Sequence, residues 1–450
     1  MIEKKRVAGE NDKPIRVISI IRDLLQDPKL KDEYRTKPKF FTRNFKINFK
    51  TAILLILQKT NKSIQLHLNE FFKNFGNDTL ATGSAFTQAR SHLQHEIFLN
   101  LNQKGIVDVL YEDQKFQSFR GFRVLLVDGS KIQLPNSPEI CQEFGTIKFV
   151  GGKKKQVTGQ HGYGLASVMY DALNKVVLDG IIADAKAYEV DLALGHLQHT
   201  RLGDLLILDR NYPSYRFLAT LIKLPSRHFV IRCSRKSFVA ARVLFEQDVV
   251  GSRIVTLKPP SSIQKEIQKL SLPKRITVRF VSVRLSTGEL EVLVTSLVDE
   301  KLYPTEMFKE IYHLRWGVEN FYGVIKERLD LENFSGKTVL SVKQDFYATL
   351  FLTSLESILT QLADEQLALK SADNKLTQTV NNMVSFNGLK NHLVELFYSY
   401  NTTIRDILDT LTNWFKTNPT YTNRNREVPR KKSSARTSLN YYKRRKKLCF

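Results

Sequence analysis

The stretch MFKEIYHLRWGVENFYGVIKERL, residues 307–329, predicts one helix with two different faces. Its apolar residues recur at steps of three and four, as on the buried side of a helix. They are Met307, Ile311, Leu314, Val318, Phe321, Ile325 and Leu329. At about 100° per residue, four polar side chains fall in an adjacent sector of roughly 60°. They are Tyr312, Arg315, Glu319 and Lys326.

This polar stripe has two interpretations. Pairs four residues apart, such as Arg315 with Glu319, are typical of an ordinary solvated helix face. The spacing of the four residues, however, is that of the YREK signature: Tyr, two residues, Arg, three residues, Glu, six residues, Lys. With its flanking letters LRW and IKERL, the segment resembles the C-terminal catalytic helix of bacterial insertion-sequence transposases of the DDE type, in particular the insertion-sequence-four family.

The composition favours a polyanionic partner. Lys and Arg number 69 against 45 Asp and Glu, a net charge of +24. Basic side chains gain affinity for DNA by releasing the counterions condensed on its phosphates. The three cysteines, Cys141, Cys233 and Cys449, suggest neither a disulfide framework nor a metal knuckle. With no signal peptide or membrane span expected, we predict a cytoplasmic protein that associates with the nucleoid through DNA and not with a membrane.

Residues 1–110 predict a helical domain, and the resemblance to insertion-sequence transposases implies that this domain binds the DNA ends of the mobile element. The first 45 or so residues are polar and basic without a clean period, which predicts a mobile or loosely helical lead. Residues 48–58 and 64–72 predict two buried helices, and Ser84 is expected to cap a third. Thr87, Gln88 and Arg90 in this third helix are candidates for major-groove contacts, as in helix-turn-helix modules. An ordinary amphipathic helix would have the same pattern.

Residues 111–232 predict an α/β core in which two buried strands each deliver an aspartate. The run Phe122–Val127 is followed by Asp128, and the run Asp204–Leu208 by Asp209. Taken alone, Asp128 before glycine is more often a turn residue, and Asp209 the cap of the next helix. Other expected elements are a hairpin of 162–170 with 175–182, helices over 189–199 and 213–224, and a strand over 228–232.

The remaining chain predicts four further segments. Residues 233–300 alternate in polarity and predict a β-rich insertion, and residues 301–340 return to the core with the catalytic helix. Residues 341–418 are apolar at helical spacing and are a candidate dimerisation region. Residues 419–450 form a basic tail, with eleven basic residues between Arg424 and Lys447 against the single acid Glu427.

Three carboxylates without accompanying His or Cys suit Mg²⁺, which prefers oxygen ligands. We predict that Asp128, Asp209 and Glu319 hold two Mg²⁺ ions, with Mn²⁺ able to substitute. Two such ions roughly 3.5–4 Å apart activate an attacking oxygen and stabilise the leaving one at phosphorus. Arg315 and Lys326 would then hold the flanking phosphates, with Tyr312 nearby. Further candidates for DNA contacts are Arg210, Lys153, Lys154 and Lys155.

The resemblance covers most of the chain. Asp128 within Val-Asp-Gly-Ser matches the first acidic position of the family, Asp209 within Leu-Asp-Arg-Asn-Tyr the second, and Glu319 the third. It implies a ribonuclease H-like core with an inserted β domain and cut-and-paste transposition. In this reaction hydrolysis frees a 3′-OH at the element end, a hairpin forms and is reopened, and the 3′-OH joins target DNA. It also implies a homodimer that holds the two terminal inverted repeats of double-stranded DNA.

One feature departs from this family. Its well-studied members hold a flipped base on a Trp of the insert, but the only Trp residues here are Trp316 and Trp414. The aromatic residues of the insert are Phe238, Phe245 and Phe280.

Two alternatives remain open. One is a DNA-binding protein derived from a transposase that has lost catalysis, against which the intact acids and YREK residues count. The other is a ribonuclease H-like nuclease without strand transfer, which the sequence does not separate from a transposase.

Overall fold

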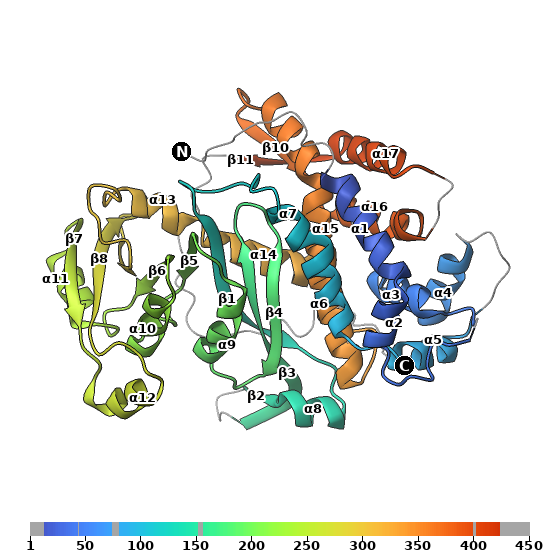
Figure 1. Cartoon of the computed structure of the whole chain (residues 1–450), viewed down its shortest axis with the longest axis horizontal. Coiled ribbons are helices and arrows are strands. Elements are labelled where there is room, and N and C mark those ends of the chain that lie inside the picture. The colour runs from blue at the N-terminus through green and yellow to red at the C-terminus, as the bar shows by residue number, and fades with distance from the viewer. Residues whose placement is uncertain (1–12, 44, 74–80, 152–155, 399–401, 424–450) are drawn as a thin grey trace.

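A mixed nine-stranded sheet runs through the centre of the protein (Figure 1). The computed structural model describes residues 13–43, 45–73, 81–151, 156–398 and 402–423. The N-terminal helices and the C-terminal helices gather at one end of the sheet, and the segment around α11, α12 and β7 lies at the other end (Figure 1). The chain is therefore a mixed α/β protein, as the sequence predicts.

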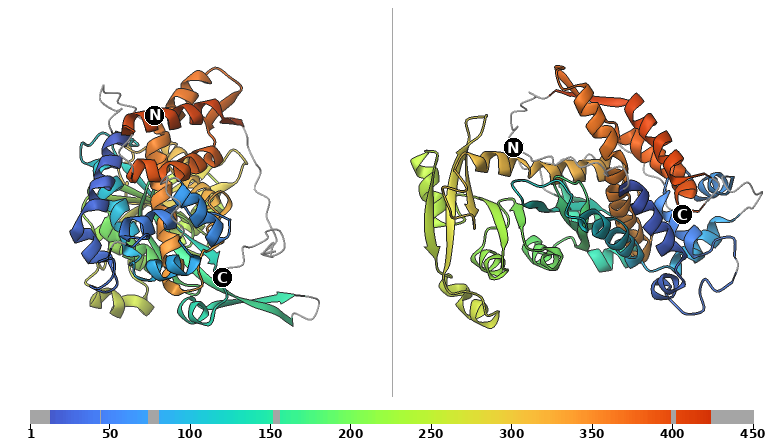
Figure 2. Two further views of the ribbon diagram at one scale, coloured as in Figure 1. Left: turned by 90° about the vertical axis from the view of Figure 1, so that its right-hand side faces the viewer. Right: turned by 45° about the horizontal axis from the view of Figure 1, so that its top comes forward.

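The strand order is β2-β3-β1-β5-β6-β9-β8-β7, with β4 also paired to β3. The central strand β1 (Arg123–Gln133) is antiparallel to β3 and parallel to β5. The strands around it are β2 (Thr146–Gly151), β3 (Gln156–Asp171), β4 (Val177–Asp184), β5 (Asp204–Leu208) and β6 (Arg227–Cys233). The predicted β3–β4 hairpin, β5 and β6 are confirmed. Strand β2 and the adjoining part of β3 project from the body of the molecule (Figure 2).

The sequence predicts that strand β1 ends just before Asp128, but the strand continues to Gln133. Its parallel pairing with β5 stops at Leu126, whereas its antiparallel pairing with the long strand β3 continues through Gln133. The hydrogen bonds from β3 extend the strand beyond its buried apolar run. Asp128 therefore lies in the second half of β1, which is paired with β3 but no longer with β5.

Helices cover both faces of the sheet. Successive side chains of a strand point to opposite faces. On β4, a β carbon at Gly180 would meet Leu350 of α15, whereas the next residue, Ile181, contacts Gly195 of α9. Helix α9 and helix α15 thus lie on opposite faces. The helices of this part of the chain are α8 (Pro138–Phe144), α9 (Glu189–His196), the 3₁₀ turn η3 (Leu197–His199) and α10 (Tyr215–Lys223).

The segment after β6 continues the same sheet. Strand β9 pairs with β6 along Val230–Cys233, where every strand residue except Arg232 is buried. Because β6 is apolar, an edge there would be exposed to water, and β9 covers it. The elements are α11 (Val239–Gln247), β7 (Gly251–Leu257), η4 (Ser261–Ile263), α12 (Gln264–Lys269), β8 (Ile276–Arg284) and β9 (Leu290–Thr295). Helix α11 was not predicted.

The stretch 307–329 forms two helices, so the prediction of one continuous helix is wrong. Helix α13 (Met307–His313) and helix α14 (Trp316–Glu327) are joined by a tighter turn at Leu314 and Arg315. There the amide of Arg315 donates to the carbonyl of Tyr312 at 3.1 Å. Gly317, a poor helix former, lets α14 approach β1, because a β carbon there would lie 3.1 Å from Leu126. The predicted buried face is confirmed, with only Leu314 half-exposed.

The N-terminal region is more ordered than predicted. Residues 13–34 form α1 and α2, and α1 buries Val17, Ile18, Ile21 and Leu25. This part of the expected mobile or loosely helical lead is therefore helical, but it is packed against the core and not loose. Helix α5 begins at Gly83 and is capped by Thr82, not by Ser84, with the Thr82 hydroxyl accepting from the Ala85 amide at 3.2 Å. The helices are α1 (Lys13–Gln26), α2 (Pro28–Tyr34), α3 (Phe49–Leu57), α4 (Ile64–Lys73), α5 (Gly83–Ser91), α6 (Glu96–Asn102), the π-helical turn η2 (Gln103–Val107) and α7 (Asp108–Tyr111).

The C-terminal region is helical, as predicted, except for one strand pair. The long helix α15 packs against α3, α6 and α17 and so joins the two helical regions. The elements are α15 (Val339–Lys370), β10 (Leu376–Val380), α16 (Asn382–Phe397), α17 (Ile404–Thr417) and β11 (Pro419–Asn423), with β10 antiparallel to β11. In the described ranges, no helix combines the length and the apolarity needed to cross a membrane. The basic tail lies outside the described residues.

Candidate active site

Asp128 lies half-buried at the edge of β1 that β5 leaves open. Its Oδ1 accepts a hydrogen bond from the amide of Gly129 at 2.9 Å. Burial raises the pKa of Asp128 to about 7, an effect that Asp209 and Glu189 strengthen and that Arg315 opposes. Because Asp128 is inside a strand, its interpretation as a turn residue is excluded.

Asp209 directly follows β5, the parallel neighbour of β1. The Tyr312 hydroxyl donates to its Oδ1 at 3.4 Å, and Arg232 Nη1 lies 3.9 Å from the same oxygen. Asp209 does not cap the next helix, since Ser214 caps α10 by accepting from the Phe217 amide. Asp128 within β1 and Asp209 just after β5 therefore belong to neighbouring strands, and Asp209 contributes to the raised pKa of Asp128.

Glu319 forms an ion pair with Arg315, with 2.7 Å between Oε1 and Nη1. Arg315 is buried, and its guanidinium lies over the rings of Tyr312 and Trp316. Among the described residues its Nε has no hydrogen-bond partner. Burial alone would lower the pKa of Arg315, but Tyr312, Glu319 and Asp209 outweigh it and raise the pKa. Arg315 thus interacts with all three predicted acids, and the ordinary ion pair with Glu319 is present as well.

Helix α14 is anchored to the site by two side chains. Lys326 Nζ donates to Ser130 Oγ and to the Lys131 carbonyl, both at 2.7 Å. The Tyr322 hydroxyl donates to the Asp128 carbonyl at 2.9 Å and to the Ala166 carbonyl at 3.0 Å. Burial lowers the pKa of Lys326. Sequence analysis missed Tyr322, although its position three residues after Glu319 and four before Lys326 places it on the same side of the helix.

The three predicted acids are not assembled around one point. Asp128 and Asp209 are neighbours, whereas Glu319 is held by Arg315. In the part of the chain that the structure describes, no group of three His, Cys, Asp or Glu side chains is arranged to hold one metal ion. The acids at this edge, Asp128 and Asp209, offer oxygen ligands of the kind that a hard cation prefers.

Glu189, the first residue of α9, is a further acid at the site that sequence analysis missed. A β carbon at Gly129 would lie 3.1 Å from Glu189 Cγ, and Asn211 Nδ2 donates to Glu189 Oε2 at 3.3 Å. The signal in the sequence was an acid at the start of the one predicted helix between the two aspartate strands.

The other predicted DNA contacts are scattered. Thr87 and Gln88 are exposed on α5, and Arg210 is exposed beside Asp209. Lys153, Lys154 and Lys155 lie outside the described residues. Among the insert aromatics, Phe280 is fully buried against Phe238, whereas Phe238 and Phe245 are half-buried.

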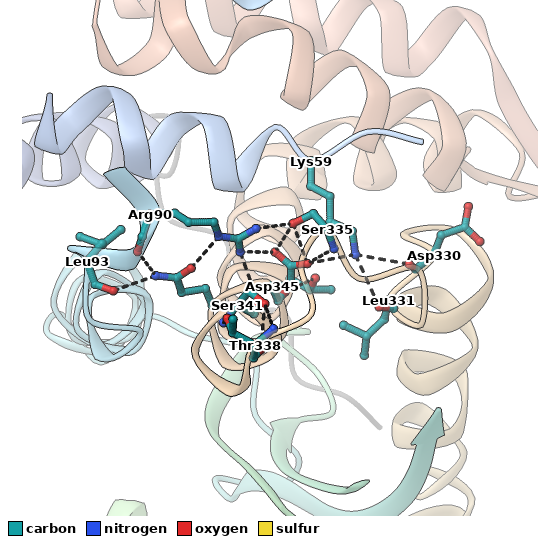
Figure 3. Close-up of polar contacts among 11 residues, drawn as sticks. Lys59, Arg90, Leu93, Asp330, Leu331, Ser335, Thr338, Ser341 and Asp345 are labelled. Carbon is teal, nitrogen blue, oxygen red and sulfur yellow. Dashed lines mark hydrogen bonds and ion pairs between the residues drawn. The ribbon is translucent and has the colours of Figure 1, made fainter. Parts of the chain in front are cut away.

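Arg90 requires a correction, because it is buried and faces the interior of the protein (Figure 3). Its guanidinium donates to Asp345 Oδ1 at 3.0 Å, to Gln344 Oε1 at 2.9 Å and to Ser335 Oγ at 2.7 Å. These partners belong to α15 and to the loop before it. An arginine used in this way is not available to read DNA bases.

The arrangement, carboxylates at the edge of a mixed sheet faced by a helix that carries Arg315 and Lys326, is compatible with action on phosphodiesters. The family described as transposase DDE domain matches residues 120–355, which is more than half of the chain and includes Asp128, Asp209 and Glu319. The chain belongs to this family of metal-dependent enzymes that cut DNA, and it is a DDE transposase. A search of curated proteins gives no match to it.

Proposed function

We propose that this transposase is of the YREK, insertion-sequence-four-like type and moves its element by cut-and-paste transposition. The spacing of Tyr312, Arg315, Glu319 and Lys326 supports the type. A ribonuclease H-like core is supported by the parallel pair β1 and β5, which deliver two aspartates to one edge of the sheet. This placement of Asp128 beside Asp209 is the single observation that carries the proposal.

The cation site of this proposal is formed by Asp128, Asp209 and Glu319, with Mg²⁺ as the ion and Mn²⁺ as a substitute. Bound there, the ions would activate the attacking oxygen and stabilise the leaving oxygen at phosphorus. Glu319 is exposed and held by a single arginine, so a change of its side-chain rotamer is enough to redirect it. Arg315 would then be free to hold a phosphate.

The DNA is held by the chain's own cations and hydroxyls. Arg315 offers a planar fork to one phosphate, and Lys326 a point charge to another. Tyr312 positions Asp209 through its hydroxyl. If a hairpin forms at the element end, Phe238 or Phe245 can stack against an extruded base, because neither is fully buried. Phe280 cannot do so without leaving the core.

The proposed organisation assigns residues 1–110 to binding of the terminal repeats. Residues 111–232 and 301–340 form the catalytic core, and residues 233–300 form the insertion. Residues 341–418 support a homodimer that holds both ends, and residues 419–450 add a non-specific basic contact to DNA. Thr87, Gln88 and Arg210 are the exposed candidates for DNA contacts.

The test is excision from a supercoiled plasmid that carries the native flanks of the element, with end binding measured in parallel. Asp128→Asn, Asp209→Asn and Glu319→Gln should each lower excision about 10³-fold or more, since each removes a ligand of the ions that stabilise the transition state. End binding should persist, because other residues hold the DNA. Excision at the unmodified rate in any of the three variants would contradict the assignment of that residue.

The same assay separates the alternatives. Strand transfer into a second plasmid distinguishes a transposase from a nuclease that only cuts. End binding without any excision by the unmodified chain would indicate a DNA-binding protein that has lost catalysis.

A further inference from the structure

Two glutamates approach the aspartate edge from opposite faces of the sheet. On β1, Leu126 contacts Gly317 of α14, the helix of Glu319. A β carbon on Gly129, three positions later, would point to the other face of the sheet, because side chains alternate along a strand. There the carboxylate of Glu189 fills the space that a side chain would need, with Oε1 at 3.3 Å from a β carbon built on Gly129.

Glu189 is tied to both aspartate segments. On one side it contacts Gly129, whose amide donates to Asp128 Oδ1 at 2.9 Å. On the other side its Oε2 accepts from Asn211, which is two residues after Asp209. Among the described residues, Glu189 has no ion pair with a basic side chain. Glu189 therefore lies beside the segments of both aspartates, and like Glu319 it would need a change of side-chain rotamer to share an ion with them, because no three such side chains are arranged around one point in the described residues. Arg315 and Arg232 are the nearby cations, and Arg232 is also paired to Glu291.

The hydroxyl of Tyr212 is a second, independent sign of a missing ligand. Tyr212 is fully buried, and its hydroxyl has no hydrogen-bond partner among the described residues. Burial raises its pKa most, and the three groups that add to this effect are Asp128, Glu189 and Asp209. The hydroxyl thus lies within the electrostatic range of all three acids. A buried polar group without a partner is costly, so such groups mark places where a ligand or its water completes the bonding.

We propose that Glu189 is a further carboxylate of the cation site, approaching from α9 as Glu319 approaches from α14, and that the Tyr212 hydroxyl binds a water molecule of the bound cation. This inference rests on the proposed function of Asp128 and Asp209. It also fits the glycine at position 129, because a β carbon there would lie 3.1 Å from Glu189 Cγ and would push the Glu189 side chain slightly away. Asn211 acts as a positioning residue that orients Glu189.

The experiment measures the binding of Mn²⁺ to the full-length protein by electron paramagnetic resonance, and the Mg²⁺ concentration for half-maximal excision. Glu189→Gln keeps the shape but removes the charge, and it should weaken Mn²⁺ binding about 10- to 100-fold. Gly129→Ala should have a smaller effect in the same direction, because its β carbon would shift the Glu189 side chain by a few tenths of an ångström. Tyr212→Phe should have a smaller one, since it removes only a contact to water. The matched control is Asp191→Asn on the same helix, because Asp191 pairs with Arg216 instead.

The outcomes separate this inference from the proposed function. Unchanged Mn²⁺ affinity in a folded Glu189→Gln variant overturns the role of Glu189, and if Asp128→Asn and Asp209→Asn still lose Mn²⁺, the proposed function stands. An equal loss in Asp191→Asn would also overturn it, because the effect would then be one of general charge. If the unmodified chain neither binds Mn²⁺ nor excises DNA, the proposed function fails and this inference with it.

Discussion

The protein contains two clusters around a carboxylate that is removed from water, and they differ in how that negative charge is compensated. At the interface of α3, α5 and α15, Asp345 is fully buried (Figure 3). It is paired with Arg90 at 3.0 Å, lies 3.9 Å from Lys59 Nζ, and accepts from the amide and the hydroxyl of Ser335. Although burial opposes it, these partners lower the pKa of Asp345. At the sheet edge, Asp128 accepts a hydrogen bond from the amide of Gly129, and burial raises its pKa to about 7.

The difference separates a structural cluster from a candidate catalytic one. A buried carboxylate is stable when the protein itself supplies cations and donors, as it does around Asp345. Around Asp128 the protein supplies further carboxylates, and Tyr212 keeps an unpaired hydroxyl. Such a site is destabilising in the protein alone, and strongly shifted pKa values of this kind cluster where ligands bind or reactions occur.

The structural cluster also joins distant parts of the chain. Lys59 reaches the carbonyls of Asp330 and Leu331 at 3.5 Å, just after α14 (Figure 3). Arg90 comes from α5 and Asp345 from α15. The cluster therefore fixes the N-terminal helices against the segment that follows the YREK residues.

The largest expected effect tests the comparison directly. Asp345→Ala leaves Arg90 buried without its carboxylate partner and should lower the free energy of unfolding by roughly 3–5 kcal/mol. Asp128→Ala removes a carboxylate that lacks compensating donors, so its free energy of unfolding without metal should stay equal or rise. Urea denaturation of both variants and of the unmodified chain measures this.

DNA excision by the Asp345→Ala and Asp128→Ala variants is the control for this stability comparison. Folded Asp345→Ala protein should still excise DNA, whereas Asp128→Ala should not. The comparison would be broken if Asp345→Ala were as stable as the unmodified chain, or if Asp128→Ala were the less stable of the two.

Glu356 allows a more specific test of the comparison, because it is buried like Asp345 but has a raised pKa like Asp128. It is buried in α15, its carboxylate accepts a hydrogen bond from the Ser385 hydroxyl, and burial raises its pKa to about 7. The folded state therefore keeps a proton that the unfolded state loses above its pKa near 4.5. Stability should fall as the pH rises from about 4.5 to 7, by on the order of 3 kcal/mol in total. Above pH 7 this contribution stays constant.

Thermal denaturation between pH 5 and pH 8 measures the effect of Glu356. Glu356→Gln should remove most of this pH dependence and should leave excision unchanged. Glu365→Gln on the same helix is the matched control and should keep the pH dependence. A Glu356→Gln variant that retained the full dependence would assign it to other groups.

Sequence predicted the apolar elements well and the polar contacts poorly. The strand β5 and the β3–β4 hairpin follow from continuous apolar runs and a turn, which are local features. The length of β1 depends on hydrogen bonds from β3, and the break between α13 and α14 at Arg315 was not visible as a loss of periodicity. Such features depend on partners that are distant in the sequence.

Dependence on partners distant in the sequence also explains which site residues could be predicted and which could not. Asp128, Asp209 and the YREK residues were found because their spacing carries a recognisable pattern. Glu189 has no such pattern, and only the fold brings it to Gly129. Arg90 was expected on the surface because helical spacing does not show which face meets α15, 251 to 255 residues later in the chain.

The smallest expected effect is that of replacing Lys326, which makes structural hydrogen bonds and is also proposed to contact DNA. Its Nζ donates to Ser130 Oγ and to the Lys131 carbonyl, so part of its function is to hold the end of β1 against α14. If it also binds a phosphate, Lys326→Met should lower excision about tenfold, which corresponds to about 1.4 kcal/mol. It should also reduce the slope of log affinity against log salt concentration by about 1. Ser130→Ala removes one structural bond only and should leave that slope unchanged. If the slope of log affinity against log salt concentration were unaltered in Lys326→Met, Lys326 would not bind a DNA phosphate. Like Arg90, it would then be a cation that bonds only to acceptors within the protein.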